Sequence, residues 1–419
     1  MKRRSLWTAW FVAAMAAMAL GGGAKLHEGD LVAVCGDSIT EQKIYSVMIE
    51  NYLLMCQPAA RLETIQFGWG GETSWGFHRR VANDVVPFKP AVVTTCYGMN
   101  DGGYRPFDPK RQGKMYRTHQ KAIVQALKKA GVRLIVVGSP GCVDAHTFRR
   151  NPEQAAMYNV TLAKLRDIAR EIAEAEGVVF ANVLDPMIDV MTKAKAKYGD
   201  AYHLAGSDGV HPWQNGHLVM AYAFLKAMGC DGRIGTITVD LAAGTATATD
   251  GHKVLSAKGG ALELESSRYP FCFFGDPKSP RSTRGVLEFL PFNEELNRFV
   301  LVVKGAKAAR LKVTWGKATK DFAAADLAKG INLAAEFLDS PFSAPFRTVE
   351  RAVQAQQRYE TPMIKDLITR IPRFLHLVPG EEATFERLRA AATARRQELF
   401  RAAAAAVVPV KHTLHIEPQ

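Results

Sequence analysis

Apolar runs of strand length alternate with helix-length amphipathic segments through the first half of this chain. The runs are near-continuous series of apolar side chains, which is typical of strands that are covered on both faces. Parallel strands need long crossovers, and the intervening segments have that length. The pattern predicts an α/β fold with a five-stranded parallel sheet and helices on both of its faces. The expected strands are residues 31–35, 61–68, 91–98, 132–140 and 177–183.

Helical patterns occupy the segments between these strands and continue after the last one. The expected helices are residues 40–55, 76–86, 111–130, 152–176, 186–197 and 213–228. The first domain is expected to span residues 25–235, close to a single α/β unit in length. A chain of 419 residues, 47 % of them hydrophobic, has room for a further part.

The pattern changes to period two after residue 235. Short alternating segments separated by Gly and Asp predict an antiparallel β-sandwich, or a β-layer added to the first domain, over residues 236–335. The expected strands are residues 237–241, 245–250, 253–259, 261–267, 286–292, 298–305 and 309–316.

Helical periodicity returns in residues 336–419. Two amphipathic helices are expected at residues 346–368 and 381–406, and residues 410–418 (VKHTLHIEP) can form one last strand. A coiled-coil partner site is one interpretation of the pair. Packing back on the same chain is the favoured one, because the heptads are not sustained.

The first 24 residues have the pattern of a signal peptide. Three basic residues precede an apolar run from residue 6 to residue 20, and small residues follow up to Ala24. We therefore expect an exported protein, periplasmic or secreted, that is not inserted in a membrane after cleavage. An uncleaved membrane anchor is the alternative.

The charge and the cysteines of the chain indicate which classes of partner and cofactor to expect. Loss of Lys2, Arg3 and Arg4 with the signal peptide would lower the formal charge from +13 to +10. The remaining basic residues are dispersed among acidic ones, which argues against nucleic acid and favours an ordinary solvated surface. A mild attraction for acidic polysaccharide or an anionic cell surface is the weaker alternative. The six cysteines are expected to be mostly free and buried, and no spacing indicates a metal or another cofactor.

Residues 31–40 (LVAVCGDSIT) place Ser38 at a strand-to-helix turn. Alone, such a serine is more often a helix cap than a nucleophile. Further polar or glycine-bearing turns follow at GGETS, GMND and DGVH, and each comes after a strand or opens the last helix. Because the carboxyl ends of parallel strands meet at one edge of a sheet, these turns are expected to converge on one crevice.

These four blocks, in this order, resemble the SGNH (GDSL-type) hydrolase superfamily over residues 31–228. The resemblance implies a flavodoxin-like three-layer α/β/α domain. It makes Ser38 the nucleophile, His211 the general base and acid, and Asp208 the group that orients the imidazole. The i,i+3 spacing of Asp208 and His211 suits their contact across a turn.

The same resemblance assigns an oxyanion hole to the backbone N–H groups of Ser38 and Gly71 and the side-chain amide of Asn100. This chain has FGWGGETS where the family usually carries an Asn-x-Gly-like block, so Gly70 is the donor if the loop register differs by one. Asn100 stands in Asn-Asp-Gly-Gly, which is also good turn chemistry.

Aromatic residues flank the blocks. Trp69, Tyr104 and Trp213 are candidate rim residues that would stack on a sugar, although ordinary loop packing explains them equally well. Asp37 is expected to tie the nucleophile loop to its neighbours. No role is assigned to His203, and His217 is not expected to hold a metal.

The sequence thus predicts an exported, metal-independent serine esterase without a cofactor. Its expected substrates are short-chain acyl esters, most plausibly acetyl, on a small molecule or glycan. A lipase, lysophospholipase or thioesterase of the same superfamily is the alternative enzyme. A glycan-binding surface module without catalysis is the alternative outside the enzymes, and the complete Ser-His-Asp set argues against it.

Overall fold

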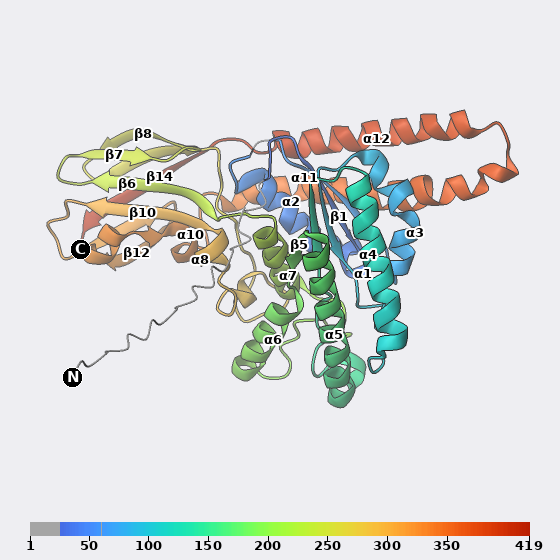
Figure 1. The fold of residues 1–419 in the computed structure, drawn as a ribbon. Coiled ribbons are helices and arrows are strands. Elements are labelled where there is room, and N and C mark those ends of the chain that lie inside the picture. Colours follow the sequence, from blue (N-terminus) through green and yellow to red (C-terminus); the bar gives the residue numbers. More distant parts are fainter. Residues whose placement is uncertain (1–25, 60) are drawn as a thin grey trace, which may run out of the picture.

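The computed structural model describes residues 26–59 and 61–419. Its first half is a five-stranded parallel sheet in the order β2-β1-β3-β4-β5 (Figure 1). All four strand pairs are parallel, so the predicted sheet is confirmed. The strands are β1 (Leu31–Gly36), β2 (Glu63–Gly68), β3 (Val92–Cys96), β4 (Leu134–Gly138) and β5 (Val179–Ala181).

Side-chain alternation along β1 explains why both faces of the sheet are covered. Val32 and Val34 pack in the cluster that contains α2, α6 and α7, whereas Ala33 and Cys35 pack in the cluster that contains α3, α4 and much of α5. The three layers of a flavodoxin-like fold result. The helices are α2 (Tyr45–Met55), α3 (Ser74–Asp84), α4 (Lys114–Lys129), α5 (Pro152–Glu176), α6 (Leu184–Tyr198) and α7 (Gln214–Ala227).

The helix predicted at residues 40–55 is wrong in one respect, because the chain forms two helices there. Helix α1 (Ser38–Glu41) ends before α2 begins. Lys43 between them has a φ of 57°, and its N–H donates to the Thr40 carbonyl at 3.0 Å, so the helical ladder is interrupted. The interruption leaves α1 as a separate turn over the end of β1.

Two further sheets follow, in the orders β13-β10-β6-β7 and β12-β11-β14-β9-β8. The expected last strand is confirmed as β14, which pairs with both β9 and β11. The strands are β6 (Arg233–Asp240), β7 (Thr245–Ala248), β8 (His252–Lys258), β9 (Ala261–Ser266), β10 (Arg298–Lys304), β11 (Arg310–Trp315), β12 (Ala318–Ala323), β13 (Ile331–Asn332) and β14 (Val410–Pro418).

Two details of the predicted sandwich are wrong. The sheets are not wholly antiparallel, because β6 and β10 pair in parallel. Residues 286–292 do not form a strand. Val286 ends a 3-10 turn, Leu290 lies in the irregular segment after it, and Phe292 begins α8 (Phe292–Leu296). All three are buried, so the apolar run there marks core contact and not a sheet. The short helices α9 (Ala324–Lys329) and α10 (Leu333–Glu336) complete this part.

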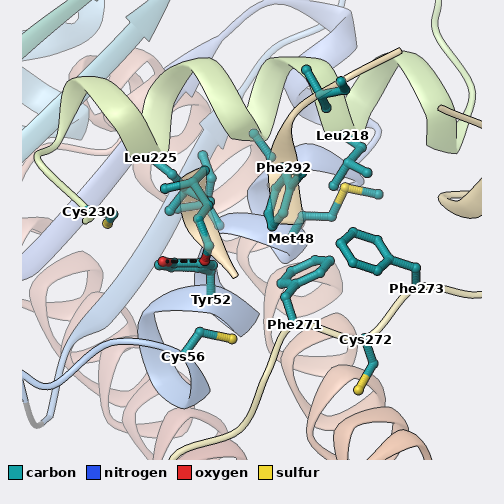
Figure 2. Close-up of a cluster of buried hydrophobic side chains, with 14 of the residues drawn as sticks. Met48, Tyr52, Cys56, Leu218, Leu225, Cys230, Phe271, Cys272, Phe273 and Phe292 are labelled. Carbon is teal, nitrogen blue, oxygen red and sulfur yellow. Dashed lines mark hydrogen bonds between the residues drawn. The ribbon is translucent and has the colours of Figure 1, made fainter. Parts of the chain in front are cut away.

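A shared apolar core joins the first half of the chain to the second. Met48 and Tyr52 of α2 face Phe271, Phe273 and Phe292 across the junction (Figure 2). The Tyr52 hydroxyl also donates to the Leu296 carbonyl at 2.9 Å. This core is continuous across residue 235, so no break in packing marks the predicted domain boundary there. The predicted domain boundaries stay predictions.

All six cysteines are free and buried, as expected. They are Cys35, Cys56, Cys96, Cys142, Cys230 and Cys272.

The helical pair packs on its own chain, as favoured above. Helix α11 (Ser343–Pro362) continues as a π-helical segment (Met363–Arg370) and a 3-10 segment (Ile371–Leu377), and α12 (Glu382–Ala405) returns beside it (Figure 1). Gln356 donates to the Thr64 carbonyl at 3.1 Å, and the Gln66 N–H donates to Glu360 at 3.0 Å. Side chains of the pair thus satisfy the outer edge of β2.

No helix in the described ranges is long and apolar enough to cross a membrane. The predicted signal peptide, residues 1–24, lies outside those ranges.

Candidate active site

Ser38 stands where β1 ends, at the carboxyl edge of the parallel sheet. The Asp37 carboxylate accepts the Ile39 N–H at 3.0 Å and closes the turn that presents Ser38. The Ser38 Oγ lies 2.8 Å from Nε2 of His211. The Ser38 N–H donates to no group in the described part of the chain.

The loop before α7 brings His211 and Asp208 to this serine. His211 Nδ1 lies 2.6 Å from Asp208 Oδ2, and Asp208 Oδ1 accepts the N–H groups of Val210 and His211, each at 2.9 Å. Burial alone would raise the pKa of Asp208, but these N–H groups and the imidazole outweigh it and hold the pKa below its usual value. An ionised Asp208 fixes the tautomer in which Nε2 accepts a proton from Ser38.

Glycine is required at one point of this loop. Gly206 has a φ of 76°, and a Cβ there would lie 1.9 Å from the His211 carbonyl oxygen. The close approach sets the position from which His211 reaches Ser38.

The two candidate donors in the glycine loop after β2, Gly70 and Gly71, differ in their hydrogen bonds. The Gly70 N–H donates to the Glu41 carboxylate and is therefore occupied. Gly71 has a φ of 72°, and its N–H donates to no group among the described residues. The geometry thus favours Gly71 over Gly70 as a donor to a bound substrate.

Asn100 faces the same place from the loop after β3. Its Oδ1 accepts the Tyr104 hydroxyl at 3.1 Å. Its Nδ2 donates to the Glu72 carbonyl at 3.0 Å and lies 3.5 Å from Asp37 Oδ2. The amide N–H groups therefore point toward the loops that carry Ser38 and Gly71.

A buried ionic network lies under the glycine loop, and the sequence analysis missed it. Arg80 binds both carboxylate oxygens of Glu72, at 2.7 and 2.6 Å, and also Asp84 at 3.0 Å. The Tyr97 hydroxyl donates to Glu72 at 2.9 Å. The GGETS block contains Glu72, but its partners come from α3 and from the residue directly after β3, and no local pattern indicates them.

Carboxyl groups are held close to the nucleophile. Asp101 accepts the Ser74 N–H at 3.0 Å and so links the loops after β3 and β2. Burial raises the pKa of Asp101 to about 6 and that of Asp37 to about 7. Asp37 contacts Ile39 and Asn100, which agrees with the structural role expected for it.

The C-terminal helical pair also reaches this site. Lys365 Nζ lies 2.6 Å from Glu41 Oε1, while the other oxygen of Glu41 accepts the Gly70 N–H. The Lys365 ammonium lies over the Trp69 ring, with Nζ 4.9 Å from the ring centroid. The glycine loop is thus held by a residue that the sequence analysis did not connect with the site, because 324 residues separate Lys365 from Glu41.

The three aromatic candidates differ in position. Trp213 lines a cleft of about 480 Å³ together with the catalytic candidates. Trp69 does not line this cleft, and its ring contacts the cations of Lys365 and Arg80. Tyr104 orients Asn100 and stacks on Tyr158 with ring centroids 5.0 Å apart. The cleft is lined by Ser38, Glu41, Gln42, Ser207, Asp208, His211 and Trp213.

The two other histidines near the cleft have structural contacts. His217 is buried, stacks on Tyr45 and lies 2.8 Å from Gln42 Oε1 through Nε2. Burial lowers the pKa of His217 to about 3, so this ring is neutral. His203 stacks edge-on against Trp213.

The first half of the chain is similar to known ester hydrolases. Residues 34–219 match the family model of the GDSL-like lipase/acylhydrolase family. An acetylxylan esterase of Geobacillus stearothermophilus is 25% identical over 226 residues, which cover 51% of this chain and 97% of that protein.

Solved structures show similarity in fold. A gut microbial diltiazem-metabolizing enzyme is 23% identical and aligns over 94% of this chain and 99% of its own, with a TM-score of 0.71. That alignment extends through the sandwich and the helical pair. A structure of a catalytic mutant of the Geobacillus stearothermophilus acetylxylan esterase is 23% identical over 49% of this chain and 96% of its own, with a TM-score of 0.41.

Proposed function

Because residues 34–219 belong to the GDSL-like lipase/acylhydrolase family and the chain is thus an ester-bond hydrolase, we propose that it removes short acyl groups, chiefly acetyl, from a carbohydrate. The single observation that carries the proposed mechanism is the hydrogen-bonded series Ser38, His211 and Asp208, with contacts of 2.8 and 2.6 Å. A serine hydroxyl becomes a nucleophile when a base within this distance accepts its proton.

In the proposed first step, Ser38 Oγ attacks the ester carbonyl carbon and His211 Nε2 takes the hydroxyl proton. The carbonyl oxygen becomes an oxyanion, which the N–H groups of Ser38, Gly71 and Asn100 would bind. His211 then donates its proton to the departing alcohol, and the acyl group stays on Ser38. In the second step, His211 takes a proton from water, whose oxygen attacks the acyl carbon. The bond between this carbon and Ser38 Oγ then breaks, His211 returns the proton to Oγ, and the acid is released.

A short acyl group is supported by the lining of the cleft. Apart from Trp213, the lining side chains are polar, and none is aliphatic. A long acyl chain would gain little free energy there, since burial of each CH₂ group against apolar surface is worth about 0.8 kcal/mol. The similarity to an acetylxylan esterase supports an acetylated sugar as the substrate.

We also propose that the protein is exported, and the support for this is its N-terminal sequence alone. The basic residues, the apolar run and the small residues before position 25 support cleavage after Ala24. N-terminal sequencing of the protein released from cells checks this, and a mature chain that retains Lys2 would contradict it.

The enzymatic proposal is tested with p-nitrophenyl esters of increasing chain length and with acetylated xylo-oligosaccharides. We expect the highest kcat/KM on acetate, and loss of activity by at least about 10³-fold in Ser38→Ala and His211→Ala. Ser256→Ala, an exposed serine of β8, is the control and should match the wild type.

Three outcomes would contradict parts of this proposal. Full activity of Ser38→Ala would contradict the nucleophile. A maximum at acyl chains of eight or more carbons would favour a lipase. No hydrolysis of any ester by the folded wild-type protein would contradict the esterase and favour a binding module.

A further inference from the structure

A second cavity adjoins the catalytic cleft. It has a volume of about 360 Å³, within the range of small-molecule sites. Gln42 and Trp213 line the cleft, whereas their chain neighbours Lys43 and Gln214 line the second cavity. The opposite wall comes from the C-terminal half of the chain. That wall is formed by Phe274, Gly275, Arg281, Thr283, Arg347, Glu350 and Gln354.

Two arginines of this wall are held by aromatic rings. The Arg281 guanidinium lies 4.2 Å from the centroid of Trp213, and that of Arg347 lies 3.8 Å from the centroid of Phe274. Neither forms an ion pair with a carboxylate within the described residues. A guanidinium that stacks through its face keeps its edge N–H groups free for a planar anion.

The charge around the cavity favours an anion. Arg281 and Arg347 line it, and Glu350 is the one acidic residue among the lining side chains. Lys43 lines it too, but its ammonium donates to the Glu41 carbonyl and to the Thr361 hydroxyl. Burial raises the pKa of Glu350, although Arg347 and Arg351 oppose the shift.

We propose that this cavity binds the carboxylate of a uronic acid residue, so that the substrate is an acylated acidic glycan. The inference rests on the proposed function, because it places the charged sugar beside the sugar whose ester reaches Ser38. Arg281 links the two places, since it stacks on Trp213, a wall residue of the catalytic cleft. A carboxylate matches the paired N–H groups of a guanidinium, and recognition of this kind is bidentate.

The proposal also gives the C-terminal half of the chain a role in specificity. Arg281 and Arg347 both lie beyond residue 235, outside the segment that matches the family model. The hydrolase segment would supply the chemistry, and the added part would select the sugar.

The test compares two acetylated oligosaccharides that differ only in a uronic acid side residue, with p-nitrophenyl acetate as a third substrate. The wild type should prefer the acidic oligosaccharide by about tenfold or more in kcat/KM. Arg281→Gln and Arg347→Gln should each remove about tenfold of the kcat/KM on it, mainly through KM, and high salt should have a similar effect. Any loss of activity on p-nitrophenyl acetate in the double variant should be much smaller than the loss on the acidic oligosaccharide, and an unfolding temperature equal to that of the wild type reports that the variant is folded.

Arg310→Gln is the matched control, because it removes an exposed arginine of β11 that is distant from the cavity in the sandwich. Equal kcat/KM on the acidic and neutral oligosaccharides would overturn the proposal, as would a preference for a sulfated oligosaccharide over the uronate. If the wild type hydrolyses p-nitrophenyl acetate but fails these comparisons, only this inference fails. If it hydrolyses no ester, the proposed function fails first.

Discussion

Hydrogen bonds to both ends of its amide set how Asn100 would meet a substrate in the proposed mechanism. A carboxamide can be rotated by half a turn with little change in shape, and then its oxygen would face the developing negative charge. The Glu72 carbonyl can only accept, so its 3.0 Å bond from Nδ2 selects the useful orientation, and the 3.1 Å hydrogen bond from Tyr104 to Oδ1 supports it. Tyr104 is therefore a positioning residue, although the sequence suggested only a place at the rim.

Asn100→Ala should lower kcat about 10² to 10³-fold, because one oxyanion donor is lost. Tyr104→Phe should lower kcat by about tenfold with a smaller change in KM, since Asn100 is retained but less well oriented. Steady-state kinetics with p-nitrophenyl acetate measure both. Tyr198→Phe, which removes a hydroxyl bonded to Glu288 on the surface, should leave kcat unchanged. A kcat loss below threefold in Asn100→Ala would contradict the assigned donor.

His412 makes the stability of the sandwich depend on pH. Its ring lies between the Trp315 indole N–H, 3.1 Å from Nδ1, and Ser266 Oγ, 2.9 Å from Nε2. Burial, with a smaller contribution from the neighbouring His252, lowers the pKa of His412 from 6.5 to about 4. The unfolded chain therefore binds more protons than the folded chain between these values, and stability falls as the pH drops through this window.

His412→Gln removes this proton uptake. Between pH 7 and pH 4.5 the wild type should lose about 2 kcal/mol more unfolding free energy than the variant does. Urea unfolding at the two pH values measures the difference, and equal losses would contradict a neutral buried His412. Other buried groups, His217 among them, are present in both proteins and cancel in the comparison.

At the scale of elements, α11 and α12 are fixed to the sheet by buried charge. Arg396 of α12 binds Glu360 of α11 at 2.8 Å and also contacts Glu63 and the Thr64 carbonyl of β2. Arg396 and Glu360 are almost fully buried. Such a pair costs free energy to desolvate, but removal of one partner leaves the other charge without compensation.

Arg396→Met should lower the unfolding free energy by about 3 to 5 kcal/mol, because Glu360 stays buried without its partner. The double variant Arg396→Met/Glu360→Gln should recover part of this loss. Arg395→Met is the neighbouring control, since Arg395 pairs with Glu398 in solvent and should contribute less than about 1 kcal/mol. Urea denaturation distinguishes the three, and equal effects at positions 395 and 396 would contradict the buried network.

The π-helical segment after α11 holds the glycine loop through Lys365 and Glu41. Lys365→Met should lower kcat about three- to tenfold with little loss of stability, because the pair is partly exposed and its function is to position Gly70 and thus Gly71. Lys193→Met, which removes an exposed pair with Asp189, is the control. An unchanged kcat with a lowered unfolding temperature would show a purely structural role.

Elements with local causes were predictable from the sequence. Each strand of the parallel sheet is a run of apolar residues, such as Val32 and Val34 in β1, and this pattern is visible in the sequence. The break at Gly36 to Ser38 depends on short-range turn chemistry. The helix break at Lys43 and the irregular segment containing Leu290 were not predictable, because tertiary contacts decide them. The same holds for Glu72 with Arg80 and for Glu41 with Lys365, whose partners meet only after the sheet has formed.

At the scale of the whole molecule, the second half of the chain is part of the structural core of the first. The sandwich is joined to α2 by the aromatic cluster, while the helical pair covers β2 (Figures 1 and 2). The two attachments hold α2 from both directions, because α2 also bonds to α11 through Glu50 and Gln357 at 2.6 Å. Stability and the geometry of the active site are therefore properties of the whole chain.

The covering of β2 by α11 has a consequence for biosynthesis. Thr64 and Gln356, which meet at the outer edge of β2, are 292 residues apart. At about 5 to 20 residues per second, a ribosome takes roughly 15 to 60 s to make the segment between them. During that time the outer edge of β2 has no partner from its own chain, and an uncovered strand edge invites pairing with other chains. The nascent chain is thus most exposed to aggregation after its first half has been made and before α11 has emerged from the ribosome.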